Sequence, residues 1–241
     1  MKHTETYFRS NSVIQTFTSP KDGRGPKDQA KSTIMGGDLP AQFMYATDYP
    51  SGGGAKKYSV GSLPAFVARY SAMKPKDRMQ YELFVVGFPL KLAFDLEFDP
   101  REYPDISMDN CIEALVSRVE RALKKVAHCV PKMRMVRLDA NRLTKTSTHI
   151  VFPEIIFCNV LHVNAFVNVH LHLDGDLSNI VDGGIYNNDR CFRMYGSQKA
   201  GKNNWLLPPG ASPKDPLDPI LLMDSLCTVV CGKEGLEAEP I

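Results

Sequence analysis

The stretch Lys91-Leu92-Ala93-Phe94-Asp95-Leu96-Glu97-Phe98-Asp99 decides how this chain folds. Read as a strand, it places Leu92, Phe94, Leu96 and Phe98 on one face, and this face predicts a core. The opposite face carries three carboxylates spaced two residues apart, with no basic side chain between them. Like charges on one strand face repel each other. The row is therefore either a solvated edge or a site for Mg²⁺ or Mn²⁺, which prefer oxygen ligands.

Composition sets limits on the kind of protein. The chain has 241 residues, of which 43% are hydrophobic and 23% charged, as in an ordinary globular protein. The net charge is only +2, so a nucleic-acid partner requires a local concentration of positive charge. The six cysteines are scattered without a CxxC pair, which favours free thiols and an intracellular protein, in the nucleus or mitochondrion of a eukaryote. No apolar run reaches the length of a membrane span, so we expect no membrane partner.

Helical and strand patterns alternate irregularly along the chain, which predicts an α+β fold. Helices are expected at Tyr7–Phe17, Leu63–Met73, Asp109–Val130, Ile155–Leu171 and Asp218–Val230, and Ser19–Gly37 is expected to be a mobile loop. Basic residues of that loop either contact a phosphate backbone or only solvate a linker. Strands are expected at 42–47, 58–60, 81–86, 91–99, 133–138, 145–153 and 191–195.

Acidic and basic side chains in three segments together predict one site. Asp95 and Glu97 come from the opening stretch, and Asp182 follows the apolar pair at 180–181. Three carboxylates from two segments can bind two divalent ions about 3.5–4 Å apart, the arrangement used for in-line phosphoryl transfer. A triphosphate also needs charge-assisted donors. The candidates are Lys145, Ser147, His149, Arg190, Arg193 and Lys199.

Other interpretations of the same residues remain open. A metal-dependent nuclease or phosphatase also uses clustered acids, although it leaves the Ser-x-His strand and the later basic residues with less to do. A non-catalytic nucleic-acid-binding module of the same fold has no physical need for three mutually repelling carboxylates. Single residues are weaker signals: a lone histidine on a strand is commonly structural, and Arg193 can form a buried ion pair.

The three segments, in this order, resemble the motifs of the archaeo-eukaryotic primase superfamily, within it the eukaryotic primase-polymerase branch. The first motif is Phe94-Asp95-Leu96-Glu97-Phe98, and the second is Lys145-Thr146-Ser147-Thr148-His149-Ile150-Val151. The third begins at Val181-Asp182-Gly183-Gly184-Ile185-Tyr186 and continues through Asn188-Asp189-Arg190-Cys191-Phe192-Arg193-Met194-Tyr195 to Ser197-Gln198-Lys199. The likeness runs from about Phe43 to Lys202.

The resemblance implies two packed α/β modules, the second similar to an RNA-recognition motif, with the active site in the cleft between them. Its expected boundaries are 1–37 for an N-terminal helix and mobile loop, 38–90 for the first module, 91–207 for the second, catalytic module, and 208–241 for a C-terminal connector and helix.

The resemblance also implies an activity. It is template-directed nucleotidyl transfer on DNA from an NTP or dNTP, covering primer synthesis, primer extension and damage tolerance. Asp95, Glu97 and Asp182 would bind two Mn²⁺ or Mg²⁺ ions, and the six basic and polar candidates, with Lys56 after the glycine-rich turn, would hold the triphosphate. Cys191 stands where the branch usually has asparagine. A C-terminal zinc-binding region linked to priming is missing from the pattern, which favours polymerase over primase activity.

Overall fold

Two antiparallel sheets form the framework of the protein. The computed structural model describes residues 14–21, 23–36, 42–127, 130 and 133–230. The larger sheet has the order β1 (Gln15–Phe17), β3 (Lys56–Ser62), β2 (Gln42–Asp48), β4 (Gln80–Phe84) and β8 (Arg190–Arg193). The smaller has the order β5 (Leu90–Phe98), β7 (Thr146–Phe157) and β6 (Val136–Asp139). Antiparallel sheets packed with helices confirm the α+β prediction.

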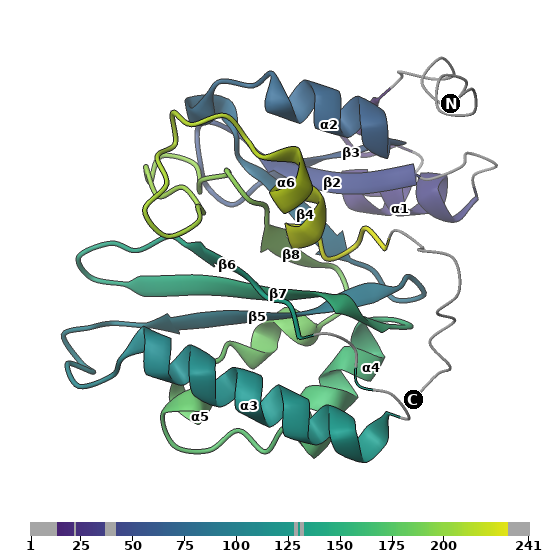
Figure 1. Cartoon of the computed structure of the whole chain (residues 1–241). Coiled ribbons are helices and arrows are strands. Elements are labelled where there is room, and N and C mark those ends of the chain that lie inside the picture. The colour runs from purple at the N-terminus through teal and green to yellow at the C-terminus, as the bar shows by residue number, and fades with distance from the viewer. Residues whose placement is uncertain (1–13, 22, 37–41, 128–129, 131–132, 231–241) are drawn as a thin grey trace, which may run out of the picture.

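Helices cover both faces of the larger sheet and the outer face of the smaller one, whose inner face is turned toward the larger sheet (Figure 1). On the larger sheet, α1 (Pro26–Met35) packs on the side of Met44 and Ala46, and α2 (Leu63–Ser71) on the side of Phe43 and Tyr45. On the smaller sheet, the outer helices are α3 (Met108–Val126), α4 (Val160–Ala165) and α5 (Asp176–Ile180). Shorter turns are η1 (Pro75–Asp77), η2 (Phe166–His170) and η3 (Gly183–Tyr186).

Strand β5 forms as its alternation predicts. Leu92, Phe94 and Leu96 are completely buried, and β5 pairs with β7 along its whole length. A β-bulge lies between Lys91 and Leu92, where the register shifts. Asp99 ends the strand as predicted: its carboxylate accepts hydrogen bonds from the backbone and side chain of Arg101.

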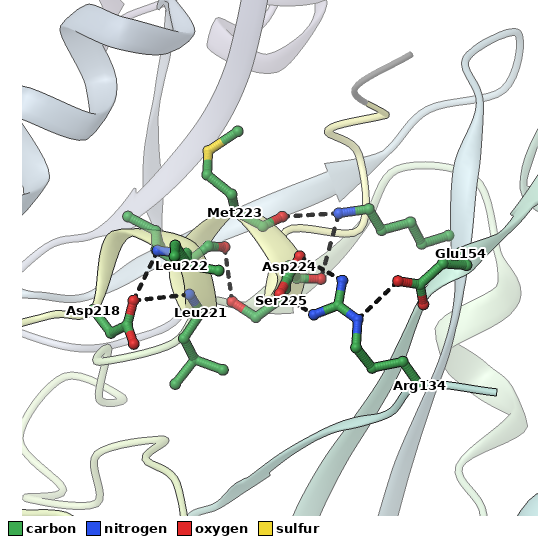
Figure 2. A network of polar contacts seen from close by, with 10 residues as sticks. Arg134, Glu154, Asp218, Leu221, Leu222, Met223, Asp224 and Ser225 are labelled. Atoms are coloured by element: carbon green, nitrogen blue, oxygen red, sulfur yellow. Dashed lines mark hydrogen bonds and ion pairs between the residues drawn. The ribbon is translucent and has the colours of Figure 1, made fainter. Parts of the chain in front are cut away.

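Lys91 shares the strand face of the acidic row but is buried away from it. Its Nζ donates to the backbone oxygens of Met223 (2.8 Å) and Asp224 (3.3 Å), at the end of α6 (Pro219–Ser225). The start of α6 is capped by Asp218, and Arg134 joins Asp224 to Glu154 (Figure 2). The C-terminal helix is thereby fastened to the smaller sheet beside the first residues of β5.

Helix α3 also follows its sequence pattern. Ser107 caps its start, with Oγ accepting from the backbone N–H of Asn110 at 3.4 Å. Its apolar stripe is buried, with Leu115 and Val119 completely so, while its basic side faces away from the sheet. No helix in the part of the chain that the structure describes is long and apolar enough to cross a membrane.

Three predicted elements are wrong, and each error has a physical cause. Gln15–Phe17 is strand β1 rather than the end of a helix, because it pairs with β3; residues 7–13 lie outside the described ones. Pro26–Met35 is helix α1 rather than a mobile loop, because Ala30 packs on the larger sheet. Residues 155–157 extend β7, so the expected helix from Ile155 begins only at Val160, where Asn159 caps it.

Strand β8 departs from the simple order of two modules. It lies within 91–207, the range expected to form the second module, yet it pairs with β4 in the larger sheet. Asp182, which bonds to β5, and Arg190, which begins β8 in the larger sheet, are therefore only a few residues apart in the chain. The likeness of the smaller sheet to an RNA-recognition motif stays a prediction, as does the cleft.

Candidate active site

The backbone brings the first and third acidic segments together. The N–H of Asp182 donates to the carbonyl oxygen of Asp95 at 2.8 Å, and Val181 forms a β-bridge with Leu96. The Asp182 side chain then turns back to cap η3, with Oδ1 accepting from the N–H of Gly184 at 2.8 Å. A Cβ on residue 184 would lie 2.8 Å from that oxygen, which explains the glycine. The two segments thus meet at one position on β5.

Register places the second segment beside the first. In the β5–β7 pair, Asp95 lies opposite His149 and Glu97 opposite Ser147. The N–H of Ser147 donates to Asn141 Oδ1 at 2.9 Å, which fixes the start of β7. The Ser-x-His pattern therefore lies on the strand next to the two carboxylates, as the sequence predicts.

Each of the three carboxylates contacts a basic side chain. Lys145 forms an ion pair with Glu97. Arg190 Nη2 lies 3.3 Å from Asp182 Oδ2, and His149 Nε2 lies 3.7 Å from Asp95 Oδ2. Each acid therefore lies next to one of the side chains that the sequence predicts to hold the triphosphate.

Asp95 is the most perturbed of the three acids. Burial raises the pKa of Asp95 to about 6, the charges of Glu97 and Asp182 add to the increase, and Arg193 and Lys145 oppose it. Its Oδ1 is buried and has no hydrogen-bond partner among the described residues. A buried carboxylate oxygen without a donor is costly, so a cation at this point would stabilise it.

His149 is held as a neutral ring. Burial lowers its pKa well below the usual range, and the charges of Arg193, Lys199 and Lys145 lower it further. The ring stacks on Phe192 of β8 with centroids 4.1 Å apart. Its Nδ1 is buried without a partner in the described part of the chain. A neutral imidazole donates from one nitrogen and accepts at the other.

Arg193 and Lys199 complete the basic side of the site. Arg193 is 5% exposed and donates from Nη1 to the carbonyl oxygen of Asn204 at 2.8 Å. Burial lowers its pKa, while Tyr81 and Asp95 raise it. Burial also lowers the pKa of Lys199, followed by the charges of Arg193 and Lys145. These couplings show that the basic residues lie near one another and near the acids.

Lys56, also predicted to hold the triphosphate, pairs with a carboxylate outside the acid cluster. Its Nζ forms an ion pair with Asp48 and lies 3.9 Å from the centre of the Tyr81 ring. Its charge lowers the pKa of Cys191, a thiol whose pKa is raised mainly by burial. Lys56 therefore lies near β8, but its charge is paired with Asp48, which is not one of the three acids.

The structure brings together Asp95, Glu97, Asp182, Lys145, Ser147, His149, Arg190, Arg193 and Lys199. Sequence reasoning missed three supports of this set. Phe192 stacks on His149, Tyr186 donates from its hydroxyl to the carbonyl oxygen of Ala93 at 2.9 Å, and Asn204 holds Arg193. Alternation along β8 could have placed Phe192 on the face opposite Arg193. No local pattern identifies Asn204.

The residues fit a divalent metal ion by their chemistry. As they stand, the described residues contain no group of three or more His, Cys, Asp or Glu side chains arranged to ligate one ion. The carboxylates of Asp95, Glu97 and Asp182 nevertheless supply hard oxygen ligands, and Asp95 Oδ1 has no other partner there. Displacing the basic side chains from these oxygens frees them for a cation.

Comparison with known families supports a primase-like nucleotidyltransferase superfamily for this chain. Residues 55–208 match the family model described as the C962R protein N-terminal AEP domain, where AEP denotes archaeo-eukaryotic primase. The chain therefore belongs to this family. The matched range includes every predicted site residue, from Lys56 to Lys199. No curated protein matches the chain. Domains of this superfamily act on nucleic acid and nucleotides and generally use divalent metal ions.

Proposed function

We propose that the protein is a template-directed DNA polymerase or primase that transfers a nucleotide from an NTP or dNTP to a 3′-hydroxyl. One observation carries the proposal: the 2.8 Å backbone bond from Asp182 to Asp95 joins two acidic motifs beside a buried carboxylate oxygen that has no partner among the described residues. An acid cluster of this kind, facing Lys145, His149 and Arg193, suits the transfer of a charged phosphoryl group.

Asp95, Glu97 and Asp182 would hold two Mn²⁺ or Mg²⁺ ions. Bound there, the ions would activate the attacking hydroxyl and neutralise the triphosphate and the leaving group. The chain's own part is to keep three acids together against their repulsion. The β5–β7 register and the Asp182–Asp95 backbone bond do this without using the carboxylate oxygens of Asp95 and Glu97.

The basic residues would exchange partners when substrate binds. Lys145 and Arg190 now neutralise Glu97 and Asp182. When the carboxylates turn to metal ions, these cations become available for the phosphate oxygens. Buried Arg193 and exposed Lys199 extend the same positive wall, and neutral His149 can donate one N–H to a phosphate oxygen. Lys56 would have to leave Asp48 to take part, so we propose a secondary role for it.

A DNA template with a primer is the proposed macromolecular substrate, and damage tolerance or repriming is the proposed setting. The test is primer extension run beside de novo synthesis, with ribo- and deoxynucleotides and with Mn²⁺ or Mg²⁺. We expect metal-dependent extension that Asp95→Ala abolishes. Extension that survives this substitution contradicts the proposal. Shortening of the primer instead identifies a nuclease, and template binding without synthesis identifies a binding module.

A further inference from the structure

A second concentration of positive charge lies away from the acid cluster. A hollow of about 400 Å³ is formed by one side of α3 and the segment that follows η2. Ala122 and Leu171 are its buried apolar residues. Its remaining wall has one acid, Asp174, two histidine rings, His170 and His172, and four cations, Arg118, Arg121, Lys124 and Lys125.

Much of this charge is not neutralised by the protein. Arg118 pairs with Asp174 and also donates to the carbonyl oxygen of His172, and Lys124 pairs with Glu120 at 2.7 Å. Arg121 and Lys125 form no ion pair within the described residues, although the charge of Arg121 contributes to lowering the pKa of Asp174, after the larger effect of Arg118. Arg121 makes only a 3.3 Å bond from Nε to the carbonyl oxygen of Ser117, one turn earlier in the helix.

Helix stability explains only part of this arrangement. Lys124 and Lys125 lie in the last turn of α3, where positive charge favours the helix dipole. Arg118 and Arg121 are further from the helix end, and Arg118 is oriented by two contacts to a different segment. Arg121 and Lys125 are four residues apart, so they lie on one side of the helix about 6 Å apart along its axis.

The hollow is separate from the proposed active site. Helix α3 covers the outer face of the β5–β7–β6 sheet, and the larger sheet lies on the other side (Figure 1). The ring of His149, next to Asp95, stacks on Phe192 of that larger sheet, so the acid cluster faces inward. A ligand in the hollow therefore cannot be the nucleotide held by Arg193 and Lys199.

We propose that this hollow binds a single-stranded nucleic acid, through its phosphates at Arg121 and Lys125 and through bases stacked on His170 or His172. Cations along a groove with nearby rings are the means by which proteins hold single strands without reading sequence. The concave shape suits a strand that enters it rather than a flat lipid surface. The inference rests on the proposed function only in taking nucleic acid as the ligand. A strand bound there is one that extends beyond the acid cluster.

The test measures binding rather than synthesis. Fluorescence anisotropy follows a labelled single strand of about 40 nucleotides, longer than one single-strand site, with metal chelated and no nucleotide present. The full chain is compared with Arg121→Ala/Lys125→Ala over a range of salt concentrations. Lys74→Ala/Lys214→Ala is the charge-matched control, because both lysines are exposed and lie outside the hollow.

Loss of two phosphate contacts should lower the slope of log affinity against log salt by about 1.4 and weaken binding on the order of tenfold. The control should change neither quantity beyond its general charge effect. His170→Ala/His172→Ala should weaken binding with the slope unchanged, because it removes stacking and no cation. Circular dichroism checks that each variant is folded.

A slope that is the same in Arg121→Ala/Lys125→Ala as in the control overturns the proposal. The proposal is also overturned if Arg121→Ala/Lys125→Ala loses binding to vesicles of anionic lipid while its binding to the labelled strand is unchanged. Extension of a short primed template at saturating concentration should be unaffected by the variant. If the full chain synthesises nothing but the slope falls as expected, the proposed function fails and this inference stands.

Discussion

Glu82 and Asp95 are carboxylates on strands, one in each sheet, the first fully buried and the second with one buried oxygen, and their surroundings are opposite in kind. Glu82 is 0% exposed and accepts from the N–H of Cys227 at 3.0 Å and from the N–H and hydroxyl of Thr228, both at 2.8 Å. Asp95 receives no donor at Oδ1 from the described residues and has His149 Nε2 3.7 Å from Oδ2. Both pKa values are raised, in each case mainly by burial.

The difference separates a structural acid from a functional one. The donors around Glu82 come from the C-terminal segment, so its carboxyl group ties that segment to β4. The surroundings of Asp95 instead contain two further acids, Glu97 and Asp182, whose charges oppose its ionisation. A buried carboxylate oxygen to which the described residues offer no donor is available to a ligand.

The largest effect should come from Asp95→Asn. We expect extension activity to fall by about 10³-fold or more, because a proposed metal ligand is lost. In chelator, the free energy of unfolding should stay the same or rise by about 1 kcal/mol, because an unsatisfied charge beside two other acids is removed. Denaturant unfolding and primer extension measure the two quantities.

Asp99→Asn is the matched control for this prediction. Asp99 lies on the same strand face but bonds to Arg101. Activity should be unchanged. A strong loss of activity in Asp99→Asn, with Asp95→Asn still active, would overturn the assignment of the two acids.

Glu82→Gln should break the other half of the comparison. An amide nitrogen replaces one acceptor oxygen and faces buried N–H donors, so we expect the protein to lose about 2–4 kcal/mol of stability. Glu113→Gln, at an exposed position of α3, is the control. Urea denaturation measures both variants. An unchanged midpoint for Glu82→Gln would mean that the C-terminal segment is held by other contacts.

Lys145→Ala tests whether Lys145 pairs with Glu97 only in the absence of nucleotide and binds a phosphate when nucleotide is present. The Lys145 side chain is 29% exposed and that of Glu97 33%, so losing their ion pair should change stability by less than about 1 kcal/mol. The KM for the nucleotide should rise about 10- to 100-fold, because a charge-assisted bond to a phosphate is lost. Steady-state kinetics with Lys214→Ala as control decide the point. An unchanged KM would make Lys145 a structural partner of Glu97.

Asp189 is a third acid to compare with Glu82 and Asp95, because it is paired with the cations of two lysines. Burial tends to raise its pKa, but Lys31 and Lys27 of α1 hold the pKa of Asp189 below its usual range. A lowered pKa contributes stability above the unfolded-state value of about 3.9, and this stability is lost as pH falls through the folded-state pKa. Asp189→Asn should therefore cost about 1 kcal/mol at neutral pH.

The cost of Asp189→Asn should begin to shrink below about pH 4, where Asp189 of the unfolded chain becomes protonated, and should vanish below the lowered pKa of the folded carboxyl. Asparagine keeps the backbone conformation of this residue, whose φ is 62°, so the substitution isolates the charge. Thermal unfolding at a series of pH values tests this dependence. A difference between the two proteins that does not vary with pH would contradict the ion-pair explanation.

The sequence predicts elements whose pattern is strong within one segment. Strand β5 and helix α3 are correct because their apolar periods are long and regular. Helix α1 was missed because only Ala30 is buried in it; its contacts are with a distant strand and with Asp189, which no local pattern reveals. Residues 155–157 are an apolar run that fits both the strand period and the helix period. Periodicity alone therefore could not decide between a strand and a helix there.

The candidate site divides in the same way, into residues that a local motif identifies and contacts that only the folded structure reveals. Its acids and most of its basic residues were predictable because motif order carries them. The pairing of each acid with a base, the ion pair that holds Lys56 to Asp48, and the support of His149 by Phe192 arise from the way two sheets meet. These contacts join residues far apart in sequence and need the folded structure to be seen.

The position of β8 has a consequence for the order in which the chain can fold. The larger sheet takes β4 from residues 80–84 and β8 from residues 190–193, with the whole smaller sheet between them in sequence. During synthesis from the N-terminus, β5, α3, β6 and β7 leave the ribosome before β8 does. Strand β4 can pair with β2 on one side during this time, but its other edge still lacks β8. Until then β4 has an open edge able to pair with another chain. Any fragment that stops short of residue 190 keeps that edge, and should aggregate more readily than a fragment that continues through residue 230.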